Sequence, residues 1–227
     1  MFESNVKVMS EIGMIAVYPF YVSWLRSMAF PIRNNSMLPT LSSVLFHLKK
    51  SFFSGGVSAL FRGYWIHRIH KLLELTGSRF KYVGIISFYP MTVILTRVVI
   101  SNADALHVIK VTIKTDGYSG LWKGIIPTVM AHLVSDYINK VKDMIEKRCK
   151  LDPDDCELLD ASAAMVSLTM TLPLIRLAAV LRSQSNSDLF PPVQSVLEIV
   201  KGLEWREMMT CFSTCLFIIG ISLKVRN

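Results

Sequence analysis

Six apolar or amphipathic stretches divide the chain; most are about 18–25 residues long, enough to cross roughly 30 Å of hydrocarbon, and the last is shorter. Hydrophobic residues make up 52% of the sequence and charged residues 19%, below the roughly 25% of soluble domains. The mean hydropathy is +0.42. These values exclude a disordered chain and an ordinary soluble enzyme, and they predict an all-α membrane protein of about six transmembrane helices. The expected spans are 6–30, 57–75, 82–100, 120–138, 158–181 and 208–223.

The net charge of +8 favours anionic lipid headgroups as the partner of the basic excess. A nucleic-acid partner is not expected, because no soluble, basic face with interleaved aromatic residues is found. The bilayer itself is therefore the first predicted partner.

An internal repeat is the most specific pattern in the sequence. Each odd span contains one proline, at Pro19, Pro90 and Pro173, and a proline inside a helix removes a hydrogen bond and favours a kink. Arg26 and Arg97 each follow seven residues after their proline. The repeated unit is therefore predicted to be a kinked helical hairpin.

A glycine-bearing element follows the first two hairpins. Gly56 and Gly63, with Arg62 before the second glycine, align without a gap on Gly117, Lys123 and Gly124. Of this element only Gly202 persists in the third part of the chain. We expect three repeats within one membrane domain, 1–78, 79–150 and 151–227, with amphipathic connector helices near 41–53, 103–115 and 192–201.

On these prolines and glycine elements the chain resembles the mitochondrial carrier superfamily. The resemblance implies three two-helix repeats in a carrier-like bundle. In that family an acid at the second position after each proline and a base at the fifth form a salt-bridge gate that opens and closes during transport. Here those acids and bases are absent, and the positions hold Tyr21, Trp24, Thr92, Leu95, Ile175 and Ala178.

The missing gate decides the functional expectation, because alternating access needs two states that are each closed by their own interactions. The pattern is most similar to the divergent mitochondrial carrier homolog branch. That resemblance implies a non-transporting protein of the outer mitochondrial membrane, an insertase or docking receptor for helical, tail-anchored proteins or apoptotic factors. The alternatives are a solute carrier of the inner membrane with a degenerate gate, which would have a solute partner, and a structural scaffold subunit of a membrane complex.

Ionisable residues recur inside the expected spans, where they are costly unless they face protein or water. We expect His132, Asp136, Asp160 and Arg176 to line a polar groove; the alternative is that they pair internally and hold the bundle together. Lys71, Arg182 and Lys224 lie near helix ends, where snorkelling to the interface explains their charge.

No enzyme motif is found: phosphate-binding glycine loops, zinc-protease helices and serine-hydrolase elbows are all missing. His67, His70 and Glu74 share a helix face, but a polar stripe explains them better than a metal site. The chain is expected to be neither an enzyme nor a cofactor or metal protein.

Overall fold

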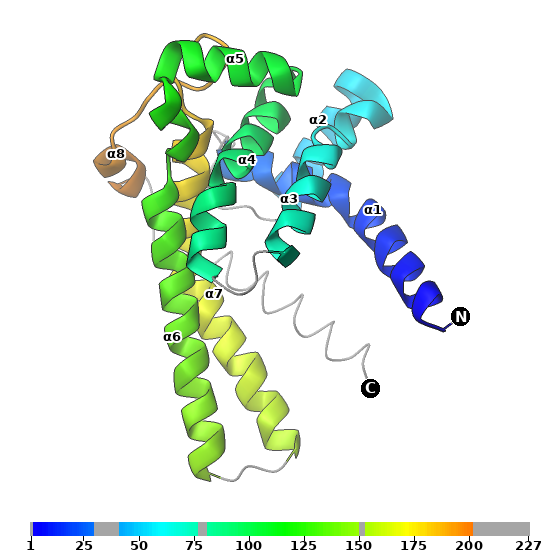
Figure 1. Ribbon diagram of the computed structural model, residues 1–227, viewed down its shortest axis with the longest axis vertical. Helices are drawn as coiled ribbons and strands as arrows, with labels where there is room; N and C mark the ends of the chain where they lie inside the picture. The colour runs from blue at the N-terminus through cyan, green and yellow to red at the C-terminus, as the bar shows by residue number, and fades with distance from the viewer. Residues whose placement is uncertain (1, 30–40, 77–80, 150–152, 202–227) are drawn as a thin grey trace.

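The computed structural model describes residues 2–29, 41–76, 81–149 and 153–201, and every regular element in these ranges is helical (Figure 1). The expected sixth span, 208–223, and Gly202 lie outside them. The elements are α1 Phe2–Ala29, α2 Leu41–Leu60, α3 Tyr64–Thr76, α4 Lys81–Ser101, α5 Ala105–Asp116, the 3₁₀ turn η1 Tyr118–Trp122, α6 Ile125–Cys149, α7 Pro153–Ser183 and α8 Val196–Lys201.

The odd-numbered spans were predicted closely. The helices α1, α4 and α7 match the expected stretches 6–30, 82–100 and 158–181, with ends that differ by one to five residues. Each contains its proline inside the helix. Within the described ranges, two helical segments are long and apolar enough to cross a membrane, namely Lys81–Ser101 and Asp155–Ser183.

The second and fourth spans begin later than predicted. Helix α3 starts at Tyr64 rather than at residue 57, and α6 starts at Ile125 rather than at 120. The cause is the same in both places, since the glycine element forms a turn of its own. Helix α6 then continues eleven residues past its expected end at 138.

The two glycine elements have the same backbone, which extends their sequence match to three dimensions. Gly56 has φ 63° and ψ −156°, and Gly117 has φ 68° and ψ −172°. The closing glycines, Gly63 and Gly124, have φ 80° and 83°. Only glycine adopts these left-handed angles without strain, so both turns require glycine at both ends.

The amphipathic connector helices lie near their expected positions. Helix α5 matches 103–115 closely, and α8 falls within 192–201. Helix α2 begins at the expected Leu41 but runs to Leu60, across the break at Gly56.

The core lies where α1, α4 and α7 converge, which are the helices of the first, third and fifth predicted spans. Each of the three contacts the other two. One buried cluster joins Tyr18 and Val22 of α1 to Leu95 and Val99 of α4. A second joins α1 to α7, and a third joins α4 to α5 and Phe190. Helices α6 and α7 run side by side and extend beyond the rest of the bundle (Figure 1).

Candidate functional site

The two repeated arginines, Arg26 and Arg97, make the same kind of hydrogen bond, which joins α1 to α4 and α4 to α7. Arg26 Nε on α1 donates to the Val99 carbonyl on α4 at 2.9 Å, and Arg97 Nε on α4 donates to the Arg182 carbonyl on α7 at 2.9 Å. Each acceptor lies nine residues after the proline of its helix. The repeat is therefore visible in the contacts as well as in the sequence.

The remaining nitrogens of these guanidinium groups differ in their partners. Arg26 donates to Ser51 Oγ and to Asn102 Oδ1, which are both neutral acceptors. Arg97 donates to Thr112 Oγ1 at 2.8 Å and also forms an ion pair of 2.8 Å with Asp116. Only the second repeat neutralises its buried arginine with a carboxylate in the part of the chain that the structure describes.

Asp116 is the centre of a charged cluster at the end of α5. Its side chain is 1% exposed and also pairs with Lys123 Nζ at 3.0 Å. Burial raises the pKa of Asp116, but hydrogen bonds from Lys123, Arg97 and Ser185 outweigh it, so the pKa lies below its ordinary value. The carboxylate stays ionised and ties α4 to the second glycine turn.

The closing glycines lie against the helix that begins the following repeat, Gly63 against α4 and Gly124 against α7. A Cβ on Gly63 would come within 2.7 Å of Leu95 Cδ1, and one on Gly124 within 2.8 Å of the Ala178 carbonyl oxygen. Leu95 and Ala178 are both fifth-position residues. The turns therefore pack directly against the places where carriers have the bases of their gate.

Packing contacts dominate at four of the six gate positions, namely Tyr21, Trp24, Leu95 and Ala178. Tyr21 stacks on Trp24 with ring centroids 6.5 Å apart, and both pack against the cluster that contains Leu95. Trp24 also packs against the second cluster, so it links α1 to both α4 and α7. Ala178 is fully buried. Aromatic and aliphatic contacts therefore stand where carriers have the ion pairs of their gate.

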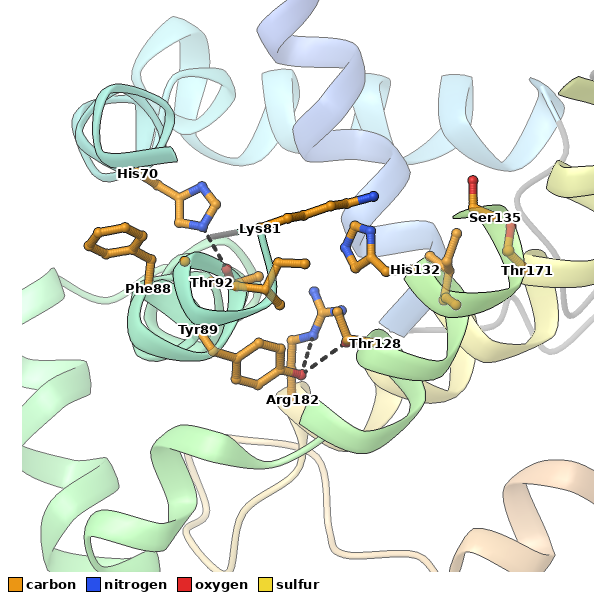
Figure 2. Close-up of a pocket in the computed structure, with 14 residues that line it drawn as sticks. His70, Lys81, Phe88, Tyr89, Thr92, Thr128, His132, Ser135, Thr171 and Arg182 are labelled. Atoms are coloured by element: carbon orange, nitrogen blue, oxygen red, sulfur yellow. Dashed lines mark hydrogen bonds between the residues drawn. The ribbon is translucent and has the colours of Figure 1, made fainter. Parts of the chain in front are cut away.

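A cavity of about 610 Å³ lies beside these positions, between α3, α4, α6 and α7. Thr92 and Ile175 line it, and His70 on α3 contacts Thr92 Oγ1 at 3.1 Å (Figure 2). Its wall mixes apolar surface with polar side chains from four helices. The polar and charged lining residues are His70, Lys81, Tyr89, Thr92, Thr128, His132, Ser135, Thr171 and Arg182.

Arg182 is the charged group at the inner end of the cavity. Its Nε donates to the Tyr89 hydroxyl and its Nη2 to Thr128 Oγ1, both at 3.1 Å, and its guanidinium lies 5.5 Å from the Tyr89 ring centroid (Figure 2). The residue is 9% exposed. Among the described residues, no carboxylate pairs with it, so its charge meets only neutral groups.

Lys81 and Asp136 mark the other end. Lys81 at the start of α4 forms an ion pair with Asp136 on α6, and the Tyr82 hydroxyl donates to the same carboxylate at 2.7 Å. The Lys81 side chain is 50% exposed. Lys81 and Tyr89 are eight residues apart on α4, about 12 Å of helical rise, which separates this end from Arg182.

The structure brings the four predicted groove residues to different places. His132 lines the cavity, and Asp136 lies at its outer end in contact with Lys81. Asp160 is 64% exposed and pairs with Lys142 at 2.7 Å along the α6–α7 hairpin. Arg176 is buried in α7 but is not among the cavity-lining residues.

Arg182 is the residue that sequence reasoning misjudged. Its place near a helix end predicted snorkelling, but the side chain is buried and points toward Tyr89 and Thr128 in Figure 2. Those partners are 93 and 54 residues away along the chain. Within the described ranges, no three His, Cys, Asp or Glu side chains come together as metal ligands would.

Prolines inside α1, α4 and α7, two glycine turns with similar backbone angles and a cavity between the helices give the described residues a carrier-like arrangement. Residues 74–147 match the family model of the mitochondrial carrier proteins. The matched range covers α4, α5, η1 and most of α6, close to the second predicted repeat. The match supports the mitochondrial carrier superfamily and, with it, a mitochondrial membrane. No curated protein sequence matches the chain significantly.

Proposed function

We propose that this chain is a non-transporting, carrier-like protein of the outer mitochondrial membrane that inserts or docks helical, tail-anchored membrane proteins. In this proposal it has about six transmembrane helices in three repeats, acts on no substrate as an enzyme, and has helical clients or apoptotic factors as its partners. The observation that carries the proposal is the pairing of an uncharged gate with a cavity beside it whose largely apolar wall carries polar and charged side chains.

The gate argues against transport because its contacts are made largely by apolar packing. Leu95 is 2% exposed and Ala178 is fully buried, and each lies against a glycine turn. An ion-pair ring can open by exchanging partners, whereas packed aromatic and aliphatic groups lose burial when they separate. One closed arrangement is therefore favoured over two of similar energy.

The cavity argues for a polar client segment. Nine of its fourteen lining residues are polar or charged, and they come from four helices. A charged residue at the bilayer centre costs about 2.5–3.5 kcal/mol on insertion scales, and a polar wall lowers that cost. A short polar flank of a client helix would cross the membrane beside such a wall.

The test is insertion of a tail-anchored client into liposomes that contain the purified protein. Asp136→Asn keeps the shape of the side chain and removes the charge at the cavity end. We expect it to change client insertion, measured as a protease-protected fragment, at unchanged protein level. Asp143→Asn, an identical change on the same helix with a 57% exposed side chain, is the matched control.

A loss of protein level or thermal stability without an insertion defect would instead make Asp136 structural. Equal insertion by liposomes with and without the protein would refute the insertase. Protease accessibility of the termini in intact mitochondria tests the outer membrane against the inner.

A solute carrier is the second candidate, because a cavity of about 610 Å³ falls in the size range of small-molecule sites. Saturable exchange of a nucleotide or carboxylate in the same liposomes would favour it over the insertase. Co-purification with other subunits at fixed stoichiometry would favour a scaffold.

A further inference from the structure

The charges of the cavity have one sign at its inner end. Its lining contains two permanent cations, Lys81 and Arg182, and two histidines, His70 and His132, while none of the described lining residues is a carboxylate. Asp136 neutralises Lys81 at the outer end. Among the described residues, Arg182 at the inner end has no carboxylate as a partner.

Neutral hydrogen bonds do not fully compensate a buried guanidinium. The Tyr89 and Thr128 hydroxyls accept from Nε and Nη2 of Arg182, and both acceptors are neutral. A buried charge is costly unless an opposite charge meets it, and guanidinium–carboxylate bonds are among the strongest hydrogen bonds in proteins. An anion that reached this end would therefore be stabilised.

The cavity admits a flank and not a whole helix. A spanning helix about 10 Å wide and 30 Å long occupies roughly 2,400 Å³. The cavity volume of about 610 Å³ is a quarter of that. Its occupant is thus a short segment of a client whose hydrophobic helix stays in lipid.

We propose that Arg182 receives the terminal carboxylate of the short carboxyl-terminal flank that a tail-anchored client passes across the membrane. Every client of this class carries that group at the leading end of its flank, and it is ionised at neutral pH because an α-carboxyl has a pKa near 3.5. The ion pair replaces part of the hydration that the carboxylate loses. This inference rests on the proposed insertase function and names the chemical group that the site recognises.

The experiment compares two versions of one synthetic client, with a free terminal carboxylate or with a terminal amide. Insertion is measured as protease protection in phosphatidylcholine liposomes that contain the full-length protein. We expect the free acid to insert roughly tenfold more than the amide, the ratio that corresponds to about 1.4 kcal/mol. Arg182→Gln should bring the ratio close to one, and Arg182→Lys should keep most of it.

Arg148→Gln, which removes an exposed cation in the last turn of α6, is the matched control and should retain the full ratio. If Arg182→Gln does not fold, Asp136→Asn provides the second test. Removal of that carboxylate frees Lys81, so the ratio of acid to amide should rise.

Three outcomes are decisive against the inference. Equal insertion of acid and amide, both above protein-free liposomes, overturns it and leaves the insertase intact. Insertion of neither client above that background refutes the proposed function itself. Loss of the ratio on addition of phosphatidylglycerol assigns Arg182 to a lipid headgroup and overturns the carboxylate assignment.

Discussion

Arg26 and Arg97 occupy equivalent places one repeat apart, yet within the described residues only Arg97 meets a carboxylate, Asp116 at 2.8 Å. The position equivalent to Asp116 in the first repeat is Gly55, sixty-one residues earlier. The repeats also differ four residues further on, where the first repeat has Ala59 and the second has Gly120. A Cβ on Gly55 would lie 2.8 Å from Ala59 Cβ, and a Cβ on Gly120 would collide with that of Asp116.

These two pairs of positions predict that the first repeat accepts an aspartate at position 55 only if Ala59 is also replaced by glycine. Gly55→Asp alone should lower the thermal stability, because the new Cβ meets Ala59. Gly55→Asp with Ala59→Gly should recover it and supply Arg26 with a charged partner. The melting temperature in detergent measures both. A double variant no more stable than the single one would contradict the equivalence of the two repeats.

The Asp116 cluster should be a source of stability that acid removes. Asp116→Asn leaves Arg97, which is fully buried, without its charged partner, and such a loss costs about 3–5 kcal/mol. The folded pKa of Asp116 is below its ordinary value of 3.8, so its contribution is present above pH 3.8 and is lost as the pH falls through the folded value. Unfolding at a series of pH values from 6 downward should show this loss in the native chain and not in Asp116→Asn.

The glycine turns should differ in tolerance according to what a methyl group would meet. Gly124→Ala should destabilise most, because its Cβ would lie 2.8 Å from a backbone oxygen that cannot move aside. Gly63→Ala should cost less, since its obstacle is the end of the Leu95 side chain. Gly117→Ala has open space and should cost only the strain of a positive φ, about 1–2 kcal/mol. Melting temperatures in any other order would contradict this packing.

Restoring a gate pair should not create transport. Thr92→Asp with Leu95→Lys returns the acid and base of one repeat, but it places a charge at a side chain that is 2% exposed. We expect lower thermal stability and no saturable exchange of nucleotides or carboxylates in liposomes, with Thr92→Ser as the control. A gain of exchange would show that the missing charges alone prevent transport.

The amino-acid sequence by itself determined the helices, the repeat and the missing gate. Apolar length and the prolines are local signals, so α1, α4 and α7 were predicted to within a few residues. The sequence alignment of Gly56 with Gly117 is matched in the structure by similar positive φ angles, which glycine adopts without strain. The late starts of α3 and α6 were missed, since the same glycines form a turn that apolar composition does not reveal.

Only the tertiary structure decided which charges face the cavity. Arg182 was assigned to a helix end, but its partners Tyr89 and Thr128 come from α4 and α6. Asp136 and Asp160 both carry charge within expected spans, yet one lies at the cavity and the other along an exposed hairpin. Helical spacing places side chains on one face of their own helix, whereas contact between helices depends on rotation and register that no single segment encodes.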